Sequence, residues 1–207
     1  MRSTPRRARR SSRSAADPAA AALAVDRIPL DGFPLRDDVV LLRKLALEDA
    51  GAIAQACRDP EITRWTFMPA GLTVPQAKDW IERAEDTYLR ARAIRFAIVD
   101  VASTQFAGQI GIGHLDWEQQ VGEIFYWLAA DARGRGLAVR ATKLLAAWAF
   151  DVLQLARIEI TVDPENEPSQ RVAAAAGFTR EGVLRSYQRF KDGRMDAVMY
   201  SRLPTDD

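Results

Sequence analysis

The stretch VGEIFYWLAADARGRGLAVR, residues Val121–Arg140, joins a strand pattern to a helix pattern through a glycine-rich connection. Its first part, residues 121–129, is mostly apolar and aromatic, which is typical of a β-strand. From about 138 to 153 large apolar residues recur every three or four positions, which predicts a helix with one buried face. The connection DARGRG therefore lies between a strand and the first turn of a helix.

This connection has the composition of an anion-binding loop. The first turn of a helix has unpaired N–H groups and the positive end of the helix dipole. Gly134 and Gly136 would let an anion approach the backbone, and Arg133 and Arg135 would add positive charge. Such a loop suits a phosphate or pyrophosphate, although its spacing matches neither a nucleoside-triphosphate loop nor a dinucleotide fingerprint. A glycine-rich turn with solvated arginines is the alternative interpretation.

The segments around this stretch predict more strands and helices. Strand patterns lie at 39–45, 95–100, 106–117, 156–162, 183–190 and 195–203, the last two joined by the hairpin turn KDG. Helical spacing is found near 50–57, 73–91 and 169–176. Thr73 and Gln76 have the spacing of a capping box, and Gly177 is a plausible residue to end the last helix. Two prolines predict an irregular loop over 60–71.

The order of these elements predicts the fold class. A strand, a helix and a second strand over 121–162 imply a parallel, right-handed crossover. The other strands follow one another through short turns, which favours antiparallel pairing. We therefore predict an α+β fold: a mixed, mostly antiparallel sheet with a central parallel βαβ crossover and helices on both faces.

The charge of the chain is unevenly distributed. It contains 29 Lys and Arg against 28 Asp and Glu. Six of the arginines lie within residues 1–14, which contain no acid, so the rest of the chain is net acidic and does not resemble a nucleic-acid binder. We expect residues 1–34 to be a disordered Arg/Ala-rich extension and residues 35–207 to form the domain. A transit peptide or a nucleic-acid-binding arm would have a similar composition.

Rare residues exclude several kinds of site. One cysteine, Cys57, permits no intrachain disulfide, and one histidine, His114, excludes a multi-histidine metal site. No stretch approaches the ~18–20 apolar residues of a membrane span. These features predict a cytoplasmic protein without a metal and without a membrane partner.

The pattern Arg133-x-x-Gly136-x-Ala138 after a strand resembles the pyrophosphate loop of the GNAT superfamily of acyl-CoA-dependent N-acyltransferases. The resemblance extends over most of the range 35–203. Four segments resemble, in order, the branch that contains the ribosomal-protein alanine N-acetyltransferases (RimJ/RimL-like). They are RDPEITRWT (58–66), GEIFYWLAADARGRGLA (122–138), DPENEPSQRVAAAAGF (163–178) and EGVLRSYQRFKDGRMDAVMYSRL (181–203).

The resemblance implies an acetyl-CoA site. The backbone from Gly134 through Leu137 to Ala138 would bind the pyrophosphate, with Arg133 and Arg135 beside it. The strand that contains Tyr126, Trp127 and Leu128 would run beside the pantetheine arm, and a backbone N–H near its end would stabilise the oxyanion. Asn166 would meet the pantetheine from the other side, act as a helix N-cap, or do both.

The resemblance also implies catalytic roles. Glu123 is the first candidate for the base that deprotonates the amine, with His114 and Asp116 as alternatives. The family's tyrosine general acid is replaced by Ala173, so Ser169 is the candidate proton donor to the thiolate, with Tyr187 as an alternative. Trp65, Phe67 and Trp117 are candidates for walls of the acceptor pocket.

The sequence is compatible with several functions. The leading hypothesis is acetyl transfer from acetyl-CoA to a primary amine, either a protein N-terminus or a small molecule. Transfer of a larger acyl group such as succinyl, a non-catalytic CoA-binding regulatory domain and nucleic-acid binding through the arm are the alternatives. The resemblance also leaves a homodimer open.

Overall fold

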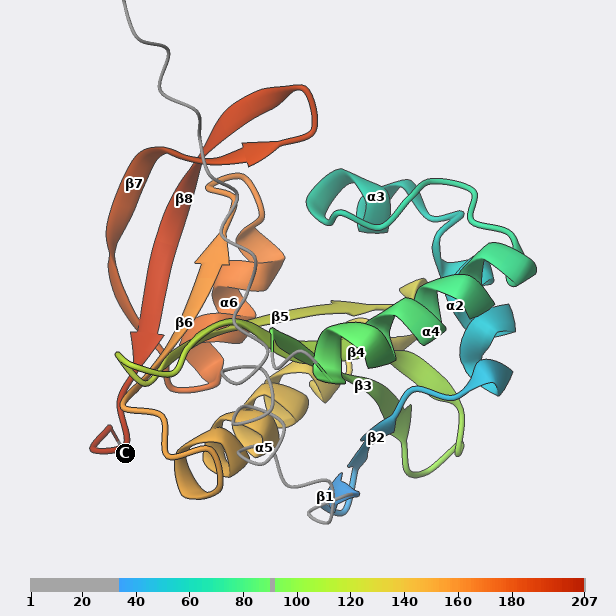
Figure 1. The fold of residues 1–207 in the computed structure, drawn as a ribbon, viewed down its shortest axis with the longest axis horizontal. Helices are drawn as coiled ribbons and strands as arrows, with labels where there is room; N and C mark the ends of the chain where they lie inside the picture. The colour runs from blue at the N-terminus through green and yellow to red at the C-terminus, as the bar shows by residue number, and fades with distance from the viewer. Residues whose placement is uncertain (1–33, 90–91, 207) are drawn as a thin grey trace, which may run out of the picture.

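A computed structural model describes residues 34–89 and 92–206, and its core is an eight-stranded sheet (Figure 1). The strand order is β1-β2-β3-β4-β5-β6-β8-β7. The strands are β1 (Leu35–Arg36), β2 (Val40–Lys44), β3 (Ala93–Asp100), β4 (Phe106–Asp116), β5 (Val121–Leu128), β6 (Arg157–Val162), β7 (Thr179–Phe190) and β8 (Gly193–Arg202). Only β5 and β6 pair in parallel; all other neighbouring strands are antiparallel. The predicted α+β fold with a central parallel crossover is confirmed.

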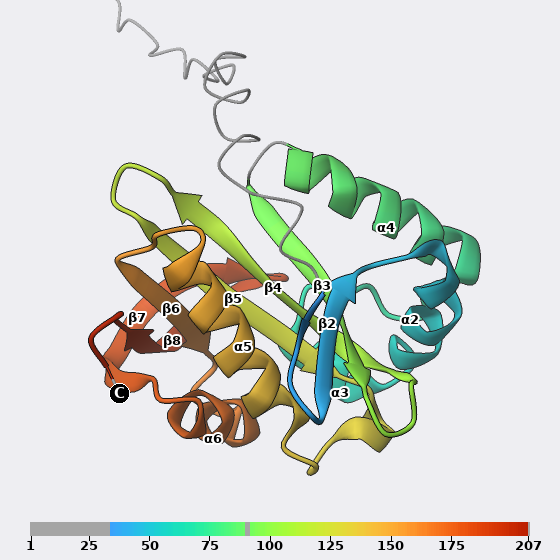
Figure 2. The same ribbon diagram turned by 90° about the horizontal axis from the view of Figure 1, so that it is seen from below.

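Helices cover both faces of the sheet (Figure 2). The crossover helix α5 (Leu137–Asp151) and α6 (Glu167–Ala175) lie on one face. The other face carries α2 (Ala50–Ala56), α3 (Pro60–Trp65) and α4 (Val74–Leu89). Two short 3-10 helices, η2 (Leu47–Asp49) and η3 (Ala130–Ala132), precede α2 and follow β5. None of the described helices is long and apolar enough to cross a membrane. The predicted N-terminal extension lies outside the described residues, apart from its last residue.

Each face has its own apolar core. The larger core packs α5 and α6 against the sheet through residues such as Leu145, Trp148 and Ile158. The smaller core, beneath α2 and α4, contains Ile53 and Trp127. Because side chains alternate along a strand, β5 contributes Trp127 to the smaller core and its two neighbours to the larger one. Packing on both faces of the sheet therefore holds the backbone of β5 in place.

The start of α4 confirms the sequence prediction, whereas the start of α3 contradicts it. The predicted capping box before α4 is present: the Thr73 N–H donates to Gln76 Oε1 at 2.9 Å. The expected irregular loop over 60–71 is wrong, because its first part is the helix α3. Pro60 is in the first turn of α3, where its missing N–H costs no hydrogen bond, and Asp59 caps the helix by accepting from the Glu61 N–H at 3.0 Å. A proline in that position starts a helix instead of breaking one.

The parallel pairing of β5 with β6 is short, and this positions the site. Register pairs join 121–123 of β5 to 157–159 of β6 and go no further. Beyond Glu123 the two strands diverge, as Figure 1 shows. β4 still pairs with β5 as far as Leu128, so only one edge of β5 is left open. That open edge leads directly to the start of α5.

Candidate active site

A cavity of about 990 Å³ follows the open edge of β5. It is bounded by the start of α5, the start of α6, α3 and the β7–β8 hairpin. The site residues predicted from the sequence that line it are Glu123, Tyr126, Trp127, Leu128, Arg133, Gly134, Gly136, Leu137, Ala138, Asn166 and Ser169. Arg135 does not line it. The fold therefore brings residues from three separate segments of the chain to one cavity.

The start of α5 presents backbone groups to this cavity. Gly134 and Gly136 have φ angles of 73° and 75°, in the left-handed region that favours glycine. Gly136 is the N-cap and supplies no side-chain acceptor to the first turn. The first backbone bond of the helix runs from the Arg140 N–H to the Gly136 carbonyl at 3.2 Å. The amides of residues 137–139, at the positive end of the helix dipole, are left available for an anion.

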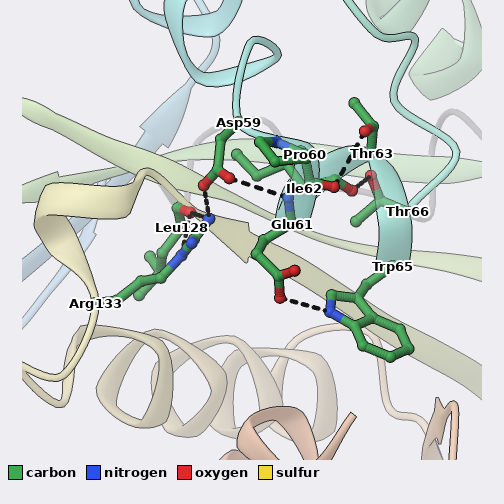
Figure 3. A network of polar contacts seen from close by, with 9 residues as sticks. All are labelled: Asp59, Pro60, Glu61, Ile62, Thr63, Trp65, Thr66, Leu128 and Arg133. Atoms are coloured by element: carbon green, nitrogen blue, oxygen red, sulfur yellow. Dashed lines mark hydrogen bonds and ion pairs between the residues drawn. The ribbon is translucent and has the colours of Figure 1, made fainter. Parts of the chain in front are cut away.

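Both arginines of this loop are held by acidic residues. Arg133 donates to the Leu128 carbonyl from Nε at 3.2 Å and from Nη2 at 3.0 Å, and it pairs with Asp59 at 2.6 Å (Figure 3). Arg135 pairs with Asp100 at 2.5 Å and holds the pKa of that carboxyl below its usual value. The two ion pairs therefore tie the loop to Asp59 and Asp100 and limit the directions in which the two guanidinium groups can point.

Asp59 also ties this loop to α3. It caps α3 while it pairs with Arg133, so the segment after β5 is linked directly to the start of α3 (Figure 3). Further along α3, Glu61 accepts from the Trp65 indole N–H at 3.0 Å. Sequence reasoning missed this link, although an Asp-Pro pair at a helix start is a recognisable capping signal.

Glu123 lies at the point where β5 and β6 diverge, and its carboxylate has two partners. His114 Nδ1 lies 2.6 Å from Oε2, and the Thr161 hydroxyl of β6 donates to Oε1. The Glu123 side chain is 17% exposed, whereas that of His114 is 83% exposed. The hydrogen bond to Glu123 raises the pKa of His114 above its usual value, against a smaller opposing effect of burial. Asp116, the other carboxylate considered, accepts instead from two turn amides, at Glu118 and Gln119.

A hydroxyl pair bridges the gap between β5 and α6. The Tyr126 hydroxyl lies 2.9 Å from Ser169 Oγ, and burial raises the pKa of Tyr126 to about 12. Asn166 caps α6 by accepting from the Ser169 N–H at 3.1 Å, so its predicted N-cap role is confirmed. α6 thus begins at Glu167, slightly earlier than the sequence indicated.

Aromatic rings enclose the end of the cavity beside α3. Trp65 and Phe67, two of the predicted walls, line it together with Trp80, Phe125 and Phe190. The rings of Phe67 and Phe190 meet edge to face with centroids 4.8 Å apart. Trp117, the third predicted wall, and Tyr187, the alternative proton donor, do not line the cavity.

The cavity has no arrangement suited to a metal. Within residues 34–89 and 92–206, no group of three His, Cys, Asp or Glu side chains could hold a metal ion. Cys57 is buried, and burial raises its pKa to about 11, which makes it a packing residue and not a nucleophile. The cavity instead combines a helix start with unbonded amides, an open strand edge and a carboxylate, an arrangement that suits an acyltransferase of the acyl-CoA-dependent class.

Comparison with known proteins agrees with this class. The acetyltransferase (GNAT) domain matches residues 40–179, and the chain belongs to this family. It is 36% identical to the uncharacterized N-acetyltransferase p20 of Bacillus licheniformis over 78% of this chain and 91% of that protein. The structure of Mycobacterium smegmatis RimJ in complex with CoA-disulfide is similar, with a TM-score of 0.73 and 28% identity over 83% of this chain and 86% of that one. The chain is an acyl-CoA-dependent N-acyltransferase with RimJ/RimL-like relatives.

Proposed function

We propose that this enzyme transfers an acetyl group from acetyl-CoA to a primary amine that attacks the thioester directly. The observation that carries this proposal is the open edge of β5 beside the uncapped start of α5. An extended ligand can add to an open strand edge through backbone hydrogen bonds, and a helix start binds phosphate groups. The pantetheine arm and the pyrophosphate of CoA have these two chemistries in this order.

The amides of residues 134–138 are the main pyrophosphate ligands in this proposal. Arg133 and Arg135 are already paired with acids, so they act mainly by shaping the loop. Asn166, on the opposite wall, still has its side-chain amide N–H groups available to the pantetheine when its oxygen caps α6.

The oxyanion would be stabilised by a strand amide. The Ala129 N–H donates to Ala107 of β4 at 2.9 Å. Because the direction of N–H groups alternates along a strand, the Leu128 N–H points to the opposite edge, where β6 has diverged. A donor aimed at a developing oxyanion is worth several kcal/mol to the rate, on the order of 3.

Proton transfer completes the reaction. The amine nitrogen bonds to the thioester carbonyl carbon, Glu123 accepts a proton from the nitrogen, and the C–S bond breaks to release the CoA thiolate. The thiolate takes a proton from the Tyr126–Ser169 hydroxyl pair or from water. Ala173, at the position where many superfamily members have a tyrosine, has a methyl side chain and cannot donate a proton.

The proposed donor is tested by calorimetric titration of the protein with acetyl-CoA and with succinyl-CoA. We expect one binding site, and tighter binding of acetyl-CoA than of succinyl-CoA. A preference for succinyl-CoA would assign the larger acyl group, and absence of binding by either compound would overturn the proposal.

We place the enzyme in the cytoplasm, since its one cysteine is buried and unpaired and needs no oxidising compartment.

A further inference from the structure

Arg95 of β3 lies on the same face of the sheet as Glu123. In the strand register Arg95 pairs with Gly111 of β4, which in turn pairs with Phe125 of β5. A side chain at Gly111 would come within 2.5 Å of the Phe125 ring, so glycine lets that ring lie across β4 towards Arg95. The three aligned positions therefore place the Arg95 guanidinium beside the Phe125 ring at the sheet side of the cavity.

The Arg95 guanidinium is held by aromatic rings alone. Its central carbon lies 5.4 Å from the centroid of Phe125 and 5.7 Å from that of Trp80. No hydrogen bond or ion pair joins it to any residue in the described part of the chain. A guanidinium that packs on rings keeps its N–H edge available for a bidentate acceptor. Partial burial lowers the pKa of Arg95 but leaves it charged at neutral pH.

The other cations on the cavity wall differ from Arg95. Arg133 pairs with Asp59, and Arg171 pairs with Glu167 at 3.4 Å. Arg92 also lines the cavity, but it is exposed to solvent. Arg95 is therefore the half-buried cation of this wall that has no acidic partner among the described residues.

Among the described acids that line the same cavities as Arg95, the nearest candidates for a counter-ion are engaged elsewhere or solvated. Glu123 is bonded to His114 and Thr161, and Glu61 is bonded to Trp65. Glu82 shares a smaller cavity of about 300 Å³ with Arg95, but it is exposed and makes no ion pair with it. A partly desolvated charge without a counter-ion is unfavourable and favours an anionic ligand.

We propose that Arg95 binds a carboxylate on the acceptor, so that the acceptor class is amines that also carry an acidic group. This rests on the proposed acetyl transfer, in which the amine approaches Glu123. Glu123 lies two strands away from Arg95. Its register partner is Gly113 of β4, which pairs with Ala93 of β3, two residues before Arg95. Strand geometry puts the two Cα atoms about 12 Å apart. An acceptor that bridges them has its amine and its carboxylate several bonds apart.

Matched probes test this without requiring turnover. The probes are ω-amino carboxylates of four, six and eight carbons, their carboxamides, and diamines of the same lengths. Each is titrated calorimetrically into the CoA-saturated protein. We expect the best carboxylate to bind at least about tenfold more tightly than its carboxamide, and the diamine to bind most weakly, because a bidentate charge-assisted pair is worth at least that factor.

Variants assign the effect to Arg95. In Arg95→Gln the affinity for the carboxylate falls about tenfold while that for the carboxamide stays within about twofold. Arg95→Lys retains part of the preference, and Arg185→Gln, an exposed arginine on β7 away from the cavity, changes nothing. Equal binding of carboxylate and carboxamide by the wild-type protein overturns the inference, even if amines are acetylated. A carboxylate preference that is lost in Arg95→Gln supports the inference, even if no probe is acetylated. The lack of acetylation would then count against the proposed function and not against the role of Arg95.

Discussion

At the scale of single residues, the environment of Glu123 is what makes it the candidate base. Its carboxylate is mostly buried, and both of its oxygens have donors, from His114 and from Thr161. These partners come from the neighbouring strands on either side of β5, so the carboxylate has a fixed orientation. A base held in this way faces the cavity at the point where β5 becomes open.

Replacement of Glu123 by glutamine should reduce turnover and leave CoA binding unchanged. The variant keeps the shape of the side chain but removes the base, so kcat should fall by about 10²–10⁴-fold and the pH optimum should rise. Steady-state kinetics and calorimetry with CoA measure the two effects. Asp116→Asn, which changes the carboxylate that caps a turn outside the cavity, should keep kcat near wild type. Full activity of Glu123→Gln across pH would refute the assignment.

The single histidine gives a direct readout of the same contact. NMR titration of His114 should show a pKa above 6.5, because the bond to Glu123 raises it, and Glu123→Gln should return it towards 6.5. The contact stabilises the fold fully below the unfolded pKa, and this contribution is lost as the pH rises through the higher folded pKa. An unchanged His114 pKa in the variant would show that the contact is absent in solution.

At the scale of elements, the start of α5 combines backbone shape with charge. Gly136 has a positive φ, and the residues that follow it, Leu137 and Ala138, line the cavity. The two arginines of the loop are fixed by acids that are remote in sequence: Asp59 caps the start of α3, and Asp100 is at the end of β3. The glycines of the loop therefore determine the backbone shape at the start of α5, and tertiary contacts with Asp59 and Asp100 hold this segment in position.

A pair of substitutions at Gly136 separates these two contributions. Asparagine tolerates the left-handed conformation, so Gly136→Asn should weaken CoA binding only slightly. Gly136→Asp adds a similar side chain with a negative charge, and its dissociation constant for CoA should be at least about tenfold higher than that of the asparagine variant. Calorimetry at low and high salt measures both, and the difference should shrink as salt increases. Equal affinities would remove the start of α5 from the phosphate site.

Elements with strong local patterns were predictable, whereas their contacts were not. Residues close together in the sequence determine the capping box at Thr73, the apolar face of α5 and the KDG hairpin. The pattern does not predict the helix α3, because a proline such as Pro60 either interrupts a helix or starts one, depending on its position. The divergence of β5 from β6 was not predictable, because the length of a strand pairing depends on both strands and on what packs between them. The same holds for Arg95, whose partners Trp80 and Phe125 come from different elements.

At the scale of the whole molecule, the cavity is closed above by two segments far apart in sequence. α3 and the β7–β8 hairpin face each other in Figure 1, and they meet through Phe67 and Phe190. Lys191 of the hairpin turn donates to the Thr63 carbonyl of α3. Arg64 of α3 also pairs with Glu165, before α6, at 3.2 Å. These contacts join the two halves of the sheet over the aromatic end of the cavity.

Loss of the ring contact should affect the acceptor and not the donor. Phe190→Ala removes an edge-to-face pair worth about 0.5–1.5 kcal/mol and opens the aromatic end of the cavity. The KM for the amine should rise several-fold, while the KM for acetyl-CoA should stay unchanged. Val183→Ala, at an exposed position on the same strand away from the cavity, is the matched control. An equal rise in both KM values would mean that the contact supports the whole fold.

Amine-dependent release of the CoA thiol tests acyl transfer by this chain most directly. The protein is incubated with acetyl-CoA alone and with acetyl-CoA plus amines of the acidic, neutral and cationic classes, and free thiol is followed over time. We predict little release without an amine and rapid release with at least one amine, fastest for the acidic class. Thiol release that no amine accelerates, in a protein that still binds acetyl-CoA, would contradict the assignment as an N-acyltransferase.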